Sequence, residues 1–164
     1  MTKAWVIAAL LLLSACTPSV TRFGNTSADD SNLSMIVARG ISLPQINDVM
    51  GIIIRDIDGH MCFTGCGSPF SRTVPGRHEL KGTLETPRRI NLLGWSNWKS
   101  APFETRVTLE PGWVYLVEPT VVDQKIDISF RKLCQTNDFD KTIQTLLAQN
   151  IFALPSPQSL NCSR

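Results

Sequence analysis

The sequence has few of the residues from which most catalytic sites are built. It contains two histidines, His60 and His78, among 164 residues. Acyl-transfer catalysis needs a base to activate its nucleophile, and that base is usually a histidine. His60 has no serine or free thiol placed as an obvious nucleophile. A hydrolase is therefore the weakest functional hypothesis, and we expect a protein that is not an enzyme and uses no cofactor.

Charge concentrated in one sign is also absent. Sixteen lysines and arginines face 14 aspartates and glutamates, a formal net charge of +2, and no run reaches five like charges. Nucleic-acid binding would need a concentrated basic face, so we expect no nucleic-acid partner. Beyond the first 15 residues, no apolar stretch of the sequence is long enough to span a bilayer.

One apolar run stands at the amino terminus, from Ala4 to Leu13, directly behind Lys3. Ten helical residues rise about 15 Å, half of the roughly 30 Å hydrocarbon core of a bilayer. The run is too short to cross a membrane and is typical of the apolar region of a signal peptide.

The residues that follow, Leu13-Ser14-Ala15-Cys16, resemble the lipobox of bacterial lipoproteins, Leu-(Ala/Ser)-(Gly/Ala)-Cys, at every position. The resemblance implies that diacylglycerol is attached to the Cys16 thiol and that signal peptidase II cuts before Cys16. It also implies that the new amine is usually acylated. An ordinary secretory signal with a coincidental cysteine is the alternative. Each methylene of an acyl chain that is buried in the bilayer contributes about 0.8 kcal/mol to membrane binding. Two or three acyl chains on Cys16 would therefore make an effectively permanent anchor.

The lipobox divides the chain into three expected parts. Residues 1–15 are a signal peptide, 16–32 the lipidated cysteine and a flexible tether, and 33–164 the folded domain. The tether is expected because residues 17–32 are polar and rich in turn formers. Thr17 stands where, in enterobacteria-like sorting, an aspartate implies retention at the inner membrane. Threonine at this position therefore favours the outer membrane, with the folded domain facing the periplasm.

Four cysteines remain after Cys16, and an even number in an oxidising compartment predicts two disulfides with three possible connectivities. The pairs nearest in sequence are Cys62–Cys66 and Cys134–Cys162, and we favour these. In the loop-entropy model they contribute about 2 and about 3.5 kcal/mol.

Strong turn signals divide the body of the chain. Asp58-Gly59 follows the β-rich run 52–57 and predicts a hairpin, and a second β-rich run covers 35–39. Pro75-Gly76 and Pro111-Gly112 suit type II turns, in which proline presets the first central dihedral and glycine accepts positive φ at the second. Each Pro-Gly pair is expected to lead into a strand.

Apolar and polar residues alternate with a period of two along these strands, which predicts antiparallel sheets packed as a sandwich. The faces predicted to be buried are His78, Leu80, Gly82 and Leu84; Phe103, Thr105, Val107 and Leu109; Trp113, Tyr115 and Val117; and Ile126, Ile128 and Phe130. The PG-x-H and Leu-x-PG-x-x-Tyr patterns over residues 75–115 resemble small immunoglobulin-like or transthyretin-like sandwiches of bacterial envelope proteins.

Near the end of the chain the period changes to that of a helix. Apolar residues recur at i, i+4, i+7 and i+8, namely at Phe139, Ile143, Leu146 and Leu147, after Asn137 or Asp138 as N-cap. We expect a helix over about 138–149 that packs on the sandwich, with Pro155 and Pro157 beyond it. The expected fold class is mainly β, a small antiparallel β-sandwich with one C-terminal helix.

Metal binding is the alternative to a plain binding module. Its candidate ligands are His60, Cys62, Cys66 and His78, since two thiolates and two imidazoles suit zinc or copper. The spacing is not that of a standard zinc knuckle, and exported thiols tend to oxidise, so no metal is the main expectation. The segment 56–59, Asp-Ile-Asp-Gly, superficially resembles a calcium loop, but the closing glutamate is absent and we predict a turn.

Trp95 and Trp98 stand three residues apart, shortly after Arg88 and Arg89. Exposed aromatic rings beside cations would suit another envelope protein or a glycan, while packing over one end of the sandwich is the commoner arrangement for such rings. The sequence therefore predicts a lipid-anchored envelope lipoprotein with a non-enzymatic binding or structural domain.

Overall fold

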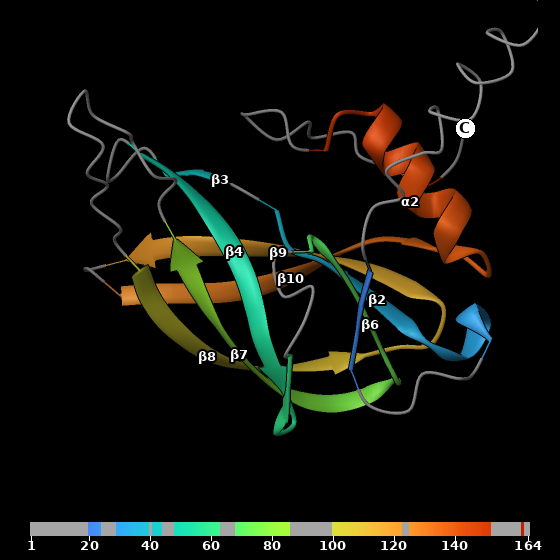
Figure 1. Cartoon of the computed structure of the whole chain (residues 1–164), viewed down its shortest axis with the longest axis horizontal. Coiled ribbons are helices and arrows are strands. Elements are labelled where there is room, and N and C mark those ends of the chain that lie inside the picture. The colour runs from blue at the N-terminus through green and yellow to red at the C-terminus, as the bar shows by residue number, and fades with distance from the viewer. Residues whose placement is uncertain are drawn as a thin grey trace, which may run out of the picture.

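Two β-sheets and one helix form three layers in the computed structural model (Figure 1). The structure describes residues 20–23, 29–39, 41–43, 48–62, 68–85, 100–122, 125–151 and 162. The first sheet has the strand order β1-β6-β2-β9-β10, and the second has the order β3-β4-β7-β8 with β5 paired to β4. The elements are β1 Val20–Arg22, β2 Ser34–Val37, β3 Ile41–Leu43, β4 Asp48–Ile57, β5 His60–Met61, β6 Phe70–Thr73, β7 Gly76–Glu85, β8 Ser100–Leu109, β9 Trp113–Val122, β10 Lys125–Gln135, α2 Phe139–Ala148 and a 3₁₀ turn at Asp30–Asn32.

The core between the two sheets follows from the period-two alternation. His78, Leu80, Gly82 and Leu84 are all buried on β7, as the sequence predicted, while the residues between them are at least partly exposed. Burying one large aliphatic side chain contributes about 1.5–3 kcal/mol, so this face drives the two sheets together. The cluster consists of Phe23, Ile36, Ala38, Ile52, Ile54, Ile57, Leu80, Leu84, Phe103, Leu109, Tyr115, Val117 and Ile128.

The predicted turns at Asp58-Gly59 and Pro111-Gly112 are confirmed by their backbone angles. Asp58 and Gly59 have φ of 55° and 81°, the left-handed pair that a tight hairpin between β4 and β5 requires. Gly112 has φ of 71°, and the Trp113 amide donates to the Glu110 carbonyl at 3.3 Å. Gly76 also has positive φ, 132°, and is the first residue of β7.

The helix predicted over 138–149 is confirmed as α2. Its N-cap is Asp138, whose carboxylate accepts from the Lys141 amide at 2.9 Å. Phe139, Ile143 and Leu146 are buried against the outer side of the first sheet, where α2 lies in Figure 1. In the described part of the chain, no helix has the length and apolar character needed to cross a membrane.

Because α2 covers the first sheet, β2 and β9 are buried on both faces. Val114 and Leu116 face the helix, whereas Tyr115 and Val117 face the second sheet. The alternation expected for β9 is therefore correct for its inner face, but its outer face is apolar as well. Two pairings in this sheet, β1 with β6 and β2 with β9, are parallel, so the sandwich is not purely antiparallel.

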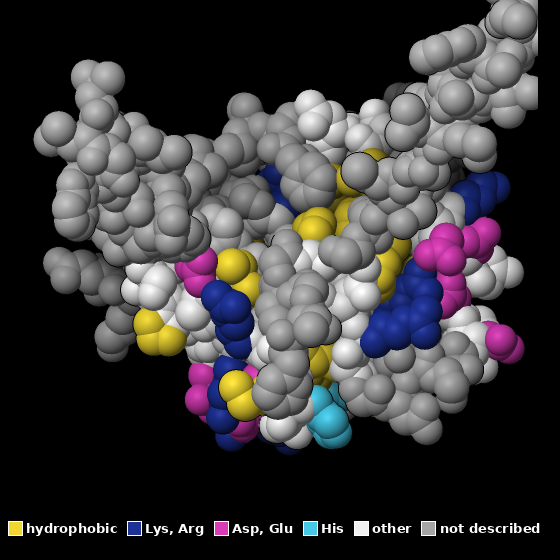
Figure 2. Space-filling view, in the orientation of Figure 1, with side chains coloured by type: hydrophobic (Ala, Val, Ile, Leu, Met, Phe, Trp, Pro, Cys, Tyr) yellow, Lys and Arg dark blue, Asp and Glu magenta, His cyan; other side chains and the backbone are white. Residues whose placement is uncertain are grey.

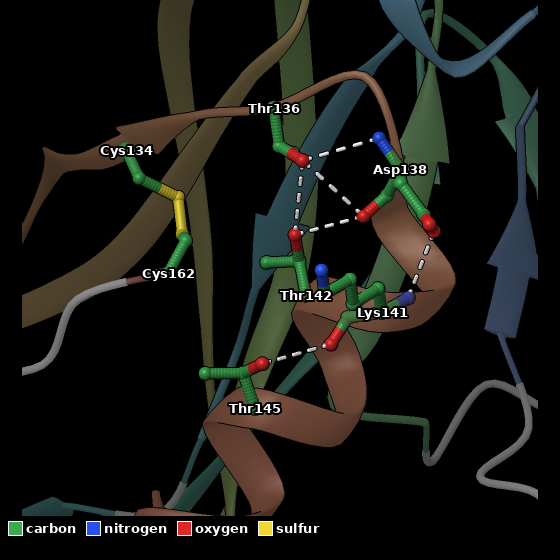
Figure 3. Close-up of a disulfide and its surroundings, with 7 residues drawn as sticks. All are labelled: Cys134, Thr136, Asp138, Lys141, Thr142, Thr145 and Cys162. Atoms are coloured by element: carbon green, nitrogen blue, oxygen red, sulfur yellow. Dashed lines mark hydrogen bonds between the residues drawn. A yellow bond between two sulfur atoms is a disulfide. The ribbon is translucent and has the colours of Figure 1, made fainter. Parts of the chain in front are cut away.

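The Cys134–Cys162 disulfide is present, as predicted, with a Cα–Cα distance of 5.8 Å (Figure 3). Both half-cystines pack against the cluster under α2. Beside the bond, the Thr136 hydroxyl accepts from the Asp138 amide at 3.1 Å and from the Thr142 hydroxyl at 3.1 Å. These bonds fix the joint between β10 and α2. Cys62 is disulfide-bonded too, and Cys66, its expected partner, lies outside the described residues.

The expectation of a flexible tether up to residue 32 is wrong for residues 20–23 and 29–32. Residues 20–22 form β1, which pairs with β6, and Phe23 is 2% exposed in the core. The Phe23 amide donates to the Arg72 carbonyl at 3.0 Å. A strand of three residues is too short to show a period in the sequence, and its partner is about fifty residues away in the register Val20↔Phe70.

Arg72 explains why the segment around Asp30 is ordered. Its side chain is 5% exposed and donates to Asp30 Oδ1 at 3.2 Å and to Asp140 Oδ1 at 2.6 Å. The other oxygen of Asp30 accepts from the Phe139 amide at 2.8 Å, at the start of α2. A buried guanidinium needs carboxylate partners, and here it joins the 3₁₀ turn, β6 and α2 into one structure.

Candidate functional site

The structure separates the residues that the sequence suggested as metal ligands. His60 is exposed on β5, Cys62 is oxidised in a disulfide, and His78 is 4% exposed on β7. Cys66 lies outside the described residues, as do Cys16 and the segment 86–99 that contains Arg88, Arg89, Trp95 and Trp98. Among the described residues, no group of three or more His, Cys, Asp or Glu side chains is placed to hold a metal ion.

The buried His78 instead pairs with Asp58, whose side chain is 41% exposed. Its Nδ1 lies 2.6 Å from Asp58 Oδ2, and its Nε2 lies 2.7 Å from the Val74 carbonyl oxygen. Each ring nitrogen therefore already has a partner within the chain, and a metal ion or a nucleophile would have to displace one of these contacts.

Asp58 holds this pair in place through its backbone and side chain. The hairpin turn brings its carboxylate beside β7, where Oδ1 accepts from the Glu79 amide at 2.8 Å. The Asp58 amide donates in return to the Glu79 carbonyl at 2.9 Å. The tip of the β4–β5 hairpin is thereby fixed to the start of β7.

Opposing effects act on the pKa of Asp58. Burial raises it, but the hydrogen bonds from the Glu79 amide and the His78 ring, together with the charges of His78 and His60, lower it more. The net result is a pKa below the usual value for aspartate. The carboxylate is therefore more stable in the folded chain than in the unfolded chain.

A shallow pocket of about 240 Å³ opens over this pair, lined by Asp58, Arg77, His78, Glu79 and Arg106. Its charges are of both signs, and Arg106 lies 3.6 Å from Glu79. Histidine atoms are visible at the lower end of the molecule in Figure 2, on the same end as charged and hydrophobic side chains.

The two exposed large hydrophobic residues of the described chain lie close in sequence to residues that line this pocket. Met61 is 62% exposed beside the hairpin turn, and Val74 is 39% exposed while its carbonyl accepts from His78. We call the group formed by Asp58, Met61, Val74 and His78 the hairpin cluster. It combines two exposed apolar side chains with the buried ring of His78.

A larger depression of about 700 Å³ lies at the start of α2 and is lined by Asp29, Asp30, Ser31, Asn137 and Asp138. Two of its carboxylates already have partners. Asp30 binds Arg72 and the Phe139 amide, and Asp138 caps the Lys141 amide. This acidic surface is therefore explained by the packing and capping of α2.

No family model, curated protein or solved structure matches this chain. A sandwich fold is confirmed by the structure, whereas the closer resemblance to immunoglobulin-like or transthyretin-like envelope domains stays a prediction.

The Asp58 carboxylate should make stability depend on pH. Because the pKa of Asp58 is lowered on folding, its carboxylate adds to the free energy of unfolding at every pH above about 4, the ordinary pKa of aspartate. This contribution is lost as the pH falls through the pKa of the folded state. Asp58→Asn should cost about 1 kcal/mol at neutral pH and flatten the acid side of the profile. Denaturant unfolding at a series of pH values measures both effects.

Asp127→Asn is the matched control, because Asp127 occupies an exposed position on β10. We expect this variant to follow the wild-type profile closely. A profile of Asp58→Asn that equals that of Asp127→Asn would show that the contact with His78 and Glu79 adds no stability.

Proposed function

We propose that this protein is a bacterial lipoprotein, held in the cell envelope by fatty acyl chains on Cys16, with a non-enzymatic binding or structural domain. The observation that carries the proposal is the complete Leu13-Ser14-Ala15-Cys16 motif directly behind an apolar run. Thr17 at the second position of the mature chain favours the outer membrane, with the domain facing the periplasm.

Two features of the domain support this proposal. The Cys134–Cys162 disulfide and the oxidised state of Cys62 suit an oxidising compartment outside the cytosol. The Asp58–His78 pair has the side chains of a catalytic dyad, but the ring nitrogen that would serve a nucleophile is bonded to the Val74 carbonyl. That geometry favours a structural role for the pair.

Replacing the lipidated residue tests the proposal. Cys16→Ala should abolish incorporation of labelled palmitate, because no other residue accepts the diacylglycerol. The domain exported behind an ordinary signal peptide, without Cys16, should appear in the periplasmic fraction. Cys162→Ser is the matched cysteine control, and this variant should still incorporate labelled palmitate because it retains Cys16. Label retained by Cys16→Ala, or a Cys16-free domain that still sediments with membranes, would refute the anchor.

We further propose that the domain contacts another envelope protein or a glycan through Trp95, Trp98, Arg88 and Arg89. A photo-crosslinking residue at Trp98 should capture that partner in cells, and Trp98→Ala should leave the free energy of unfolding nearly unchanged. A loss of about 3 kcal/mol or more on Trp98→Ala would instead assign the ring to the core of the sandwich.

A further inference from the structure

The folded domain begins very close to the proposed anchor. β1 starts at Val20, so only Thr17, Pro18 and Ser19 separate its first residue from Cys16. An extended chain advances about 3.3–3.6 Å per residue, so four steps reach roughly 14 Å at most. Because β1 is paired with β6, this limit applies to the whole domain and not to a loose tail.

The strand register shows which end of the sandwich carries this connection. β1 and β6 are parallel and β2 is antiparallel to β6, so Val20 and Val37 both lie opposite Phe70. Just beyond, the Ala38 amide donates to the Pro69 carbonyl at 2.7 Å.

The end of α2 lies at the same place. Arg39, which follows Ala38, donates from Nη1 to the Ile151 carbonyl at 3.0 Å, and Val20 packs against the cluster that contains Ile151. We call the group formed by Val20, Ala38, Arg39, Pro69 and Ile151 the anchor end.

The hairpin cluster lies at the opposite end. Four residues along β6 from Phe70 lead to Val74, a distance of about 13 Å for an extended strand. The Val74 carbonyl binds His78, and His78 binds Asp58 at the tip of the β4–β5 hairpin. In Figure 1 this hairpin lies at the bottom of the molecule, whereas α2 lies at the top.

We infer that the anchor end, together with the last turn of α2, rests on the lipid head groups of the membrane, and that the hairpin cluster points away from it. This inference depends on the proposed lipidation of Cys16. The last turn of α2 has no basic residue, and Arg39 of the anchor end is 5% exposed and bonded to the Ile151 carbonyl. The short covalent connection, rather than attraction to anionic lipid, therefore holds this end at the surface. The contact should accordingly persist at high salt.

Photo-crosslinking on vesicles tests the orientation. A benzophenone amino acid is placed at Ala148 or at Met61, both exposed, in the full lipidated chain on phosphatidylcholine–phosphatidylglycerol vesicles containing labelled lipid. We expect lipid adducts at Ala148 to exceed those at Met61 several-fold, in low and in high salt. Equal adducts, more adducts at Met61, or no adducts at either position in an acylated chain would overturn the inference.

Two controls separate this inference from the anchor itself. Intact mass and flotation with the vesicles show whether the chain is acylated; a chain without acyl mass that does not float would refute the proposed function as well. Twelve glycine and serine residues inserted before Val20 lengthen the connection to about 21 Å on average. Adducts at Ala148 should then fall several-fold with acylation unchanged, and an unchanged yield would contradict a contact set by the short connection.

Discussion

Serine at both Cys134 and Cys162 is expected to lower the free energy of unfolding by about 3 kcal/mol. The bond spans 28 residues of sequence, for which the loop-entropy model gives about 3.5 kcal/mol. Both sulfurs pack on the cluster beneath α2, so the loss should include weaker packing of the helix. Urea unfolding measures the global change, and hydrogen exchange over residues 139–148 measures the change in α2.

The single variants provide the control for this experiment. Cys134→Ser and Cys162→Ser each break the same bond, so each should lose nearly as much stability as the double variant. Strictly additive single effects, or a double variant that unfolds at the wild-type urea concentration, would show that the bond does not constrain the chain.

Gly82→Ala is expected to cost about 3 kcal/mol, although it adds only one methyl group. Gly82 is buried in β7 opposite Phe103, and β4 runs close by on its other side. A Cβ at this position would overlap with the Ile53 carbonyl oxygen and with the Phe103 ring. The ring could rotate, but the carbonyl belongs to the paired strand, so the sheet itself must shift.

Gly51→Ala is the matched control for this prediction. Gly51 is in the neighbouring strand β4, and its nearest contact for a Cβ is the Glu85 carbonyl oxygen at 3.7 Å, an ordinary van der Waals distance. We expect this change to alter stability by less than about 1 kcal/mol. Equal losses in the two variants would contradict the close approach of β4, β7 and the Phe103 ring.

The sequence predicted those parts of the fold whose signals are local. Alternation over 76–85 identified β7 and its buried face, and the spacing of Phe139, Ile143 and Leu146 identified α2. The Asp58-Gly59 turn and the Cys134–Cys162 bond also followed from neighbouring residues or from simple proximity.

Pairings between strands that are distant in sequence could not be predicted from such local signals. β1 has three residues, and β2 and β9 pair in parallel across about eighty residues, as in Met35↔Val114. Parallel pairing leaves no turn signal in the sequence, because long connections separate the strands. The polar composition around β1 therefore indicated a tether, whereas the structure has a strand paired with β6 and a 3₁₀ turn held by the Arg72–Asp30 ion pair.

The hairpin cluster was hidden for the same reason. Asp58 and His78 are twenty residues apart and come from different strands, and each had an ordinary local explanation as a turn residue and an inward-facing residue. The one available sign was that a histidine facing inward at the start of a strand needs hydrogen-bond partners for its ring nitrogens. Identifying these partners required the register of β4 against β7.

The intact mass of the protein extracted from membranes with detergent tests the proposed anchor most directly. We predict a chain that begins at Cys16 and carries diacylglycerol on its thiol, with a further acyl chain where the amine is modified. A mature chain that retains Met1, or one that begins at Cys16 without fatty acyl mass, would contradict the account.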